Sequence, residues 1–160
     1  MEWENNYFKI SGTSNSLNIK QKFSGAVAIP TDGLYYLLIK IIRSDQKEHW
    51  EFPRGFSSTN ETYIQTALRE LKEETNIKSD EQNSNFLGTV MPDSGLVNSL
   101  IGLVEIKTDF NQAIELQQQE KIVDYKLLTL DQLNEFVKQN IISDSFSLAS
   151  ILHLNYLNKK

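Results

Sequence analysis

The chain has 160 residues, a length that suits one domain with a sizeable hydrophobic core. Hydrophobic residues make up 39% and charged residues 23% of the chain, which is an ordinary composition for a globular protein. No apolar run approaches the ~18 residues that span a bilayer, and the first residues lack a secretory signal pattern. The net charge of −5 argues against general nucleic-acid binding, which needs clustered basic residues, and the absence of cysteine excludes disulfides and thiolate metal sites.

The first part of the chain predicts strands. The patterns of apolar, β-branched and turn-forming residues predict a strand over 22–30 that ends at Pro30, a turn at 31–33, a buried strand over 34–43, and a short strand over 50–52 that Pro53 ends. The first 20 residues are hard to place. Their apolar residues suit either a further strand or packing on a partner subunit.

A helix is predicted over residues 63–75. Thr62 is positioned to cap its N-terminus, with Gln65 as the second residue of a capping box. Asn76 follows as a left-handed C-cap. Apolar residues recur at helical spacing and predict a buried stripe made of Ile64, Ala67, Leu68 and Leu71.

The second half mixes strands with helices. We predict strands at about 85–91, 98–107 and 121–128, a polar connection over 108–119, a helix over 130–140 with a capping box at Thr129 and Gln132, and a last helix over 145–157 that Ser143 or Asp144 begins. Strands mixed with three helices predict an α/β or α+β sandwich in which helices pack on a sheet. We expect a single domain over residues 1–160.

Three carboxylates gather on the helix over 63–75. Glu70, Glu73 and Glu74 share one face because residues three and four apart are neighbours on a helix, and Arg69 is placed to reach Glu73. A solvated surface is the plain interpretation of such a charge run. The like-charge pair of Glu70 and Glu74 instead favours a site for a hard divalent cation such as Mg²⁺, which would let an acidic protein accept a phosphate anion.

The stretch from Gly55 to Ile77 resembles the Nudix box of the Nudix hydrolases. Gly55 and Glu61, two structural positions of the box, precede the run RELKEE at residues 69–74 at the expected spacing. One position departs from the pattern, because Asn76 replaces the final glycine, and asparagine also tolerates positive φ. The resemblance implies an α/β/α sandwich with a mixed sheet flanked by helices.

The same resemblance implies roles for individual residues. Glu70 and Glu74 correspond to glutamates that bind the catalytic Mg²⁺ or Mn²⁺, and Glu73 to a glutamate that contributes in many members. The backbone carbonyl of Arg54 corresponds to a further metal ligand. Arg69 corresponds to the arginine that orients the glutamates by ion pairing. The implied reaction is hydrolysis of a nucleoside diphosphate linked to another moiety.

Outside the box, the chain is similar to ADP-ribose pyrophosphatases. HWEFPRGF at residues 49–56 resembles the stretch that leads into their box, although Trp50 and Phe52 suit a hydrophobic core better than a ligand contact. The strand that ends at Arg43 also matches. Arg43 and Arg54 are therefore candidate substrate-binding residues, and the alternative for Arg43 is an ion pair with a neighbouring Asp.

Two later segments extend this similarity. Ser94 and Gly95 match a Ser-Gly segment and are candidate substrate-binding residues, or else belong to a simple turn. The acidic residue that usually follows is missing, since Asn98 and Ser99 occupy that region. Glu120 matches a loop glutamate and is the candidate general base or extra metal ligand, with Glu115 as the second choice and an ordinary loop glutamate as the plain alternative.

The resemblance implies a metal-dependent hydrolase of ADP-ribose or a related nucleotide sugar, giving AMP and a sugar phosphate. Two alternatives stay open: hydrolysis of dinucleoside polyphosphates, NADH or nucleoside triphosphates, and a non-catalytic domain that senses nucleotides. The expected partners are a nucleotide-type small molecule and a second copy of the chain as a homodimer, with no nucleic acid and no membrane. The lack of cysteine agrees with a cytoplasmic location.

Overall fold

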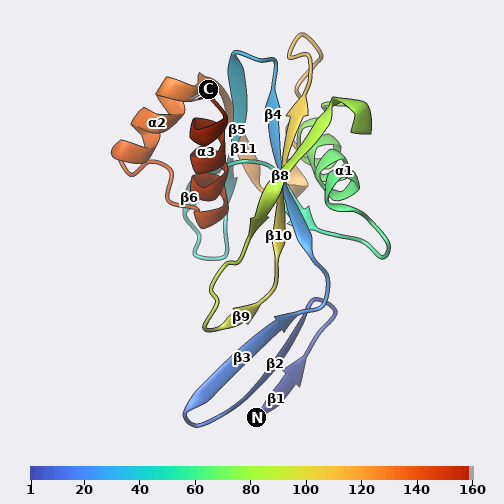
Figure 1. The fold of residues 1–160 in the computed structure, drawn as a ribbon, viewed down its shortest axis with the longest axis vertical. Helices are drawn as coiled ribbons and strands as arrows, with labels where there is room; N and C mark the ends of the chain where they lie inside the picture. Colours follow the sequence, from blue (N-terminus) through green and yellow to red (C-terminus); the bar gives the residue numbers. More distant parts are fainter. Residues whose placement is uncertain (159–160) are drawn as a thin grey trace.

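The computed structural model describes residues 1–158 and has two β-sheets, with helices on both faces of the larger one (Figure 1). The larger sheet has the strand order β11-β5-β4-β10-β8, with β6 beside β5 and β7 beside β4. Its strands are β4 (Gly25–Thr31), β5 (Tyr35–Ile42), β6 (Glu48–Glu51), β7 (Arg54–Phe56), β8 (Ser84–Val90), β10 (Ile101–Lys107) and β11 (Ile122–Thr129). The sheet is mixed because β4 pairs parallel with β10, whereas the other pairings in this sheet are antiparallel.

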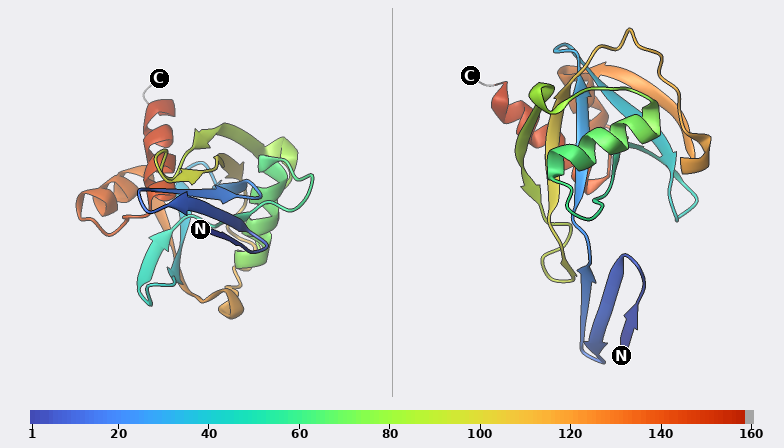
Figure 2. Two further views of the ribbon diagram at one scale, coloured as in Figure 1. Left: turned by 90° about the horizontal axis from the view of Figure 1, so that it is seen from below. Right: turned by 90° about the vertical axis from the view of Figure 1, so that its right-hand side faces the viewer.

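Helices cover both faces of this sheet, which confirms the predicted sandwich. Helix α1 (Tyr63–Thr75) lies on one face, and α2 (Leu130–Lys138) and α3 (Ser145–Leu157) lie on the other (Figures 1 and 2). Two cores result, since strand residues alternate between the faces. The core under α1 includes Leu37, Ile39 and Val104, and the core under α2 and α3 includes Leu38, Phe52 and Leu103.

Helix α1 begins and ends where the sequence predicted. The side chain of Thr62 accepts a hydrogen bond from the Gln65 N–H, and the side-chain oxygen of Gln65 accepts one from the Thr62 N–H. Asn76 has a φ of 61° and closes the helix in the left-handed conformation. Ala67 and Leu71 are completely buried, with Ile64 and Leu68 packed beside them, so the predicted stripe faces the sheet.

Several strand boundaries differ from the prediction. The expected strand over 50–52 is β6, which begins earlier, at Glu48, and ends at Glu51, and a strand that was not predicted, β7, follows Pro53, which has no N–H to donate. The expected strand over 98–107 is divided into β9 (Val97–Asn98) and β10. Phe52 is fully buried and Trp50 packs against the same core, which confirms their structural interpretation.

The N-terminal residues form a small sheet that projects from the sandwich (Figure 2). Strands β1 (Glu2–Glu4), β2 (Phe8–Thr13) and β3 (Ser16–Gln21) are antiparallel neighbours, and β9 adds a fourth strand parallel to β3. Of the two predicted roles, strand pairing is therefore correct for this segment. Through β9, the sheet is tied to the loop that connects β8 with β10.

Two short 3₁₀ helices and the last α-helix complete the fold. The 3₁₀ helices are η1 (Glu81–Asn83) and η2 (Gln118–Glu120). Asp144 caps α3 by accepting a hydrogen bond from the Ser147 N–H, which decides between the two predicted caps. None of the helices in residues 1–158 has the length and apolar character needed to cross a membrane.

Candidate active site

One cavity lies between α1, strand β7, the loop before β11 and the N-terminal sheet, and has a volume of about 850 Å³. Its wall includes all three carboxylates that the sequence singled out. Glu70, Glu73 and Glu74 come from α1, and Arg43 and Arg54 come from the ends of the strands that face them. The cavity therefore brings together the acidic helix and two basic groups from elsewhere in the chain.

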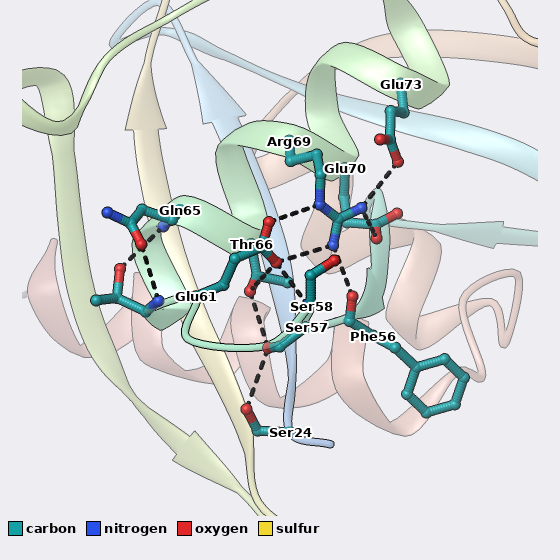
Figure 3. Close-up of polar contacts among 11 residues, drawn as sticks. Ser24, Phe56, Ser57, Ser58, Glu61, Gln65, Thr66, Arg69, Glu70 and Glu73 are labelled. Carbon is teal, nitrogen blue, oxygen red and sulfur yellow. Dashed lines mark hydrogen bonds and ion pairs between the residues drawn. The ribbon is translucent and has the colours of Figure 1, made fainter. Parts of the chain in front are cut away.

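Arg69 is the central contact of the acidic helix (Figure 3). Its Nη1 donates to Glu70 Oε1 at 2.7 Å and to Glu73 Oε2 at 2.8 Å. Its Nε donates to Glu61 Oε1 at 2.8 Å, and its Nη2 donates to the Phe56 backbone carbonyl at 2.7 Å. One guanidinium thus fixes two carboxylates of the helix and the loop that precedes it, as the orienting role predicted for Arg69 requires.

Glu61 holds the loop between β7 and α1 in place. Its Oε2 accepts hydrogen bonds from the Ser58 N–H at 2.8 Å and from the Thr66 hydroxyl at 3.1 Å. Thr66 Oγ1 also lies 2.8 Å from Ser57 Oγ, within hydrogen-bonding distance, so both Glu61 and Ser57 connect the loop to the first turns of α1 (Figure 3). This arrangement agrees with the supporting role predicted for Glu61.

We expect Glu61→Gln to lower the stability in a pH-dependent way. The hydrogen bond from Arg69, supported by those from Ser58 and Thr66, lowers the pKa of Glu61 to about 2 from its ordinary value of 4.5. Such a carboxylate stabilises the fold above pH 4.5 and loses that contribution as the pH falls through 2. The Tm should fall by about 3 °C at pH 7 and by less at pH 3, measured by calorimetry. An equal deficit at both pH values would contradict an electrostatic cause.

Glu70 lies against the backbone of Gly55. A Cβ atom at Gly55 would stand 2.2 Å from the carboxylate carbon of Glu70, so only glycine leaves room for the carboxylate in this position. The side chain of Glu70 is 12% exposed. Burial, with smaller contributions from Glu73 and Glu120, raises the pKa of Glu70 against the opposing effect of Arg69.

Glu74 is the most deeply placed of the three carboxylates. The residue is 5% exposed, and its Oε2 is buried without a hydrogen-bond partner among the described residues. Burial, together with the neighbouring charge of Glu70, raises the pKa of Glu74 to about 8, against opposing effects of Arg43 and Arg54. An uncompensated carboxylate in such surroundings is costly unless a cation or a proton joins it.

The donors of this cluster fit a hard divalent cation, although the cluster is not closed. Within residues 1–158, no three acidic or histidine side chains stand close enough together to form a ready-made metal site. Glu70 and Glu74 are close enough to influence each other, whereas Glu73 is 55% exposed and held by Arg69. The unpartnered oxygen of Glu74 is the feature that fits a cation, so the metal assignment stays a prediction.

Arg43 and Arg54 are held by a buried carboxylate that the sequence did not single out. Arg43 Nη2 lies 2.5 Å from Glu51 Oε2, and Arg54 Nη2 lies 3.2 Å from the same oxygen. The predicted alternative for Arg43, an ion pair with an aspartate, is replaced by this pair with Glu51. The one available signal was the position of Glu51 between Trp50 and Phe52, because a residue between two core residues of a strand faces the opposite side.

The structure separates the two candidates for the general base. Glu120 lies at the end of η2, lines the cavity and is near enough to Glu70 for its charge to raise the pKa of Glu70. Glu115 is not among the residues that line this cavity, and its backbone N–H is bonded to the Thr75 carbonyl at 2.9 Å. The position of Glu120 therefore suits the predicted role better than that of Glu115.

Ser94 and Gly95 lie in a turn beside the cavity. The Gly95 N–H donates to Asp93 Oδ1 at 2.8 Å, which is the turn that the sequence offered as the plain alternative. The neighbouring residues Pro92 and Val97 line the cavity, whereas Ser94 and Gly95 do not. The substrate-binding role of these two residues stays a prediction.

An aromatic group forms the outer wall, and sequence reasoning did not assign it to the site. Tyr7 stacks on Phe56 with ring centroids 5.0 Å apart, and Phe8 meets Phe56 edge to face at 5.6 Å. All three residues line the same cavity as the carboxylates. Tyr7 and Phe8 belong to the N-terminal segment, whose place beside the box was not visible from the sequence.

Comparison with known proteins supports the similarity seen in the sequence. The NUDIX domain model matches residues 22–147. No curated protein sequence matched at the significance level applied. The fold matches 375 chains of known structure. One of them is the crystal structure of an ADP compounds hydrolase, with a TM-score of 0.78 and 14% sequence identity. The match covers 98% of this chain and 89% of that chain. At this identity the likeness shows the fold, and a fold shared so widely does not identify a substrate.

Proposed function

We propose that this chain, which belongs to the NUDIX domain family, is a hydrolase that cleaves the pyrophosphate bond of a nucleoside diphosphate linked to another moiety. ADP-ribose or a related nucleotide sugar is the substrate we favour, giving AMP and a sugar phosphate. The observation that carries this proposal is the single cavity in which an acidic helix, two anchored arginines and three aromatic rings meet.

We assign a divalent cation, Mg²⁺ or Mn²⁺, to Glu70 and Glu74, with Glu73 and the Arg54 carbonyl as further ligands. The support for this assignment is the buried, unpartnered oxygen of Glu74 beside a second carboxylate. Such a cation, when bound, supplies charge neutralisation on the diphosphate and a water molecule of lowered pKa. Arg69 keeps the carboxylates of Glu70 and Glu73 oriented for this task.

The chain's own groups have separate tasks in the reaction. The guanidinium groups of Arg43 and Arg54 bind phosphate oxygens, for which their planar donor pattern is suited. Glu120, which also lines the cavity, accepts the proton of the attacking water as general base. Attack at phosphorus then breaks the bridging P–O bond, and the departing phosphate takes that bridging oxygen with it.

The aromatic wall supports a nucleoside as one half of the substrate. The faces and edges of Tyr7, Phe8 and Phe56 gather at the end of the cavity nearer the N-terminal sheet. Stacking of a base on an aromatic ring contributes about 1–3 kcal/mol and accepts any base. A ligand with a planar base at one end and a diphosphate in the middle fits this arrangement.

A substrate panel tests the proposal. The protein is incubated with Mg²⁺ and, separately, with ADP-ribose, a dinucleoside polyphosphate, NADH and a nucleoside triphosphate, and the products are identified by chromatography and mass spectrometry. We expect AMP and ribose 5-phosphate from ADP-ribose at the highest rate, and no products in EDTA. Preference for another compound would favour the alternative substrates. Binding of ADP-ribose without turnover, in Mg²⁺ or Mn²⁺, would establish the sensing function instead.

We also propose a homodimer that uses the N-terminal sheet. Trp3 in β1 and Leu17 in β3 are 51% and 41% exposed, and Tyr7, which precedes β2, is 48% exposed, which leaves apolar area uncovered in one copy of the chain. The mass in solution, measured by light scattering, tests the proposal.

A cytoplasmic location completes the proposal and agrees with the absence of cysteine.

A further inference from the structure

Glu51 is a buried carboxylate at the end of β6 that contacts both arginines of the site. Its side chain is 3% exposed. Arg43 reaches it with Nε at 3.2 Å and with Nη2 at 2.5 Å, and Arg54 reaches it with Nη2 at 3.2 Å. A carboxylate shared by two guanidinium groups offsets their repulsion and fixes their relative position.

Asp144 is a second anchor, and it comes from the other face of the sheet. Its Oδ1 lies 3.3 Å from Arg54 Nη2, and its side chain is 9% exposed. Its Oδ2 accepts hydrogen bonds from the backbone N–H and the hydroxyl of Ser147, both at 2.9 Å. The Ser147 hydroxyl in turn accepts a hydrogen bond from the Phe52 N–H at 3.0 Å. The beginning of α3 is thus bonded to the strand region that carries Arg54.

Arg54 also has a hydrogen-bond donor that neither Glu51 nor Asp144 uses. Its guanidinium lies 4.8 Å from the ring centroid of Phe146, and its Nε is buried without a partner among the described residues. A buried N–H without an acceptor costs free energy. Arg54 and Phe146 both line the cavity.

We propose that Glu51 and Asp144 are positioning residues that hold Arg43 and Arg54 in the geometry that binds the substrate's diphosphate. This inference rests on the proposed function, since it takes the diphosphate as the ligand of the two arginines. The two carboxylates bring the charge of the four groups to zero. The affinity for the anion therefore depends more on the direction of the guanidinium N–H donors than on an excess of positive charge.

The direction in which the affinity for the anion changes, when one carboxylate is removed, distinguishes a positioning role from simple charge neutralisation. Removing one carboxylate raises the local charge by +1, which by itself would tighten the binding of an anion. If Glu51 and Asp144 instead position the arginines, their removal weakens binding of the anion. The two arginines become mobile in the unbound protein, and ordering them on binding then costs conformational entropy. Glu51→Gln and Asp144→Asn keep the side-chain size, remove the negative charge and replace one acceptor oxygen by an amide NH2 group.

Asp144→Asn separates the two roles of this residue. Asparagine caps a helix about as well as aspartate, so α3 keeps its N-cap while the ion pair with Arg54 is lost. Thr129→Ala is the matched control, because Thr129 caps α2 through the Gln132 N–H and does not line the cavity. We expect the control to lower the Tm by about 3 °C without changing ligand binding.

The experiment measures the Kd for α,β-methylene-ADP with Mg²⁺ by calorimetry, since the bridging methylene of this probe resists hydrolysis, and also measures KM and kcat for ADP-ribose. Both charge variants should raise Kd and KM about tenfold and change kcat less than about threefold, because the arginines bind ground state and transition state alike. Asp144→Asn keeps the inference testable if Glu51→Gln does not fold.

The outcomes separate this inference from the proposed function. Unchanged or tighter binding by Asp144→Asn, with an active wild-type protein, would overturn the positioning role and leave the function intact. A wild-type protein that hydrolyses nothing, yet loses probe affinity in both variants, would overturn the function and support the positioning role. A wild-type protein that does not bind the probe would overturn both.

Discussion

Glu74→Gln is expected to reduce hydrolysis about a thousandfold and, at the same time, to make the metal-free protein more stable at pH 8. The first effect follows because a neutral amide is a poorer ligand for a divalent cation than a carboxylate, and the cation contributes several kcal/mol to the transition state. Of the three carboxylates on α1, Glu74 is the one whose oxygen is buried without a partner.

The second effect has the opposite sign because the pKa of Glu74 is raised. Burial and Glu70 raise this pKa to about 8 from 4.5, so the folded protein disfavours the charged form. Without metal, the fold therefore loses stability as the pH rises from 4.5 through 8, by an amount on the order of a few kcal/mol. Glutamine does not titrate and avoids this loss.

The measurement is the Tm of both proteins in EDTA at pH 5 and pH 8. We expect similar values at pH 5, and at pH 8 a Tm for Glu74→Gln that is higher by roughly 5 °C or more. Added Mg²⁺ or Mn²⁺ should raise the Tm of the wild type more than that of the variant, because the amide binds the ion more weakly.

Glu105→Gln is the matched control for this experiment. Glu105 is a half-buried carboxylate on β10 whose pKa burial also raises, and it does not line the cavity. The same chemical change there should leave hydrolysis unchanged. A Glu74→Gln variant that keeps its activity would contradict the role of Glu74 as a metal ligand, and a variant that is less stable than wild type in EDTA at pH 8 would show that Glu74 has a structural role.

Local patterns in the sequence were sufficient to predict helix α1 and its carboxylates. The capping box of Thr62 and the left-handed Asn76 depend on near neighbours, so the sequence alone contains them. The burial of Glu74 was also within reach. Ala67, Leu71 and Glu74 are spaced by four and three residues, which places a carboxylate on the stripe that faces the core.

Contacts between segments that are far apart in the sequence could not be predicted from such local patterns. Asp144 and Arg54 are 90 residues apart in sequence, and nothing in the local pattern around Asp144 indicates more than a helix cap. The N-terminal strands are short and rich in polar residues, so their alternation is weak, and their place beside the box depends on the pairing of β3 with β9. The sequence therefore singled out the three carboxylates and the two arginines that line the cavity, but not the carboxylates that hold those arginines or the aromatic wall.

Gly55→Ala is expected to reduce hydrolysis about a hundredfold with little loss of stability. The new Cβ would stand 2.2 Å from the Glu70 carboxylate, a contact that real structures do not tolerate, so the carboxylate must move. The displaced atoms are the far end of a flexible side chain, and Gly55 does not have a positive φ, so alanine suits the strand. A ligand displaced by about 1 Å costs about two orders of magnitude in rate.

A double-mutant cycle with Glu70→Ala shows whether the methyl group acts through this carboxylate. The rates of Gly55→Ala, Glu70→Ala and the double variant are compared with the wild-type rate, and calorimetry confirms that each protein is folded. If displacement of Glu70 is the whole effect, the double variant is as active as Glu70→Ala alone, since the carboxylate is already gone. A double variant whose loss equals the product of the two single losses would show that the methyl group disturbs another part of the site, and would contradict the close approach as the reason for glycine at this position.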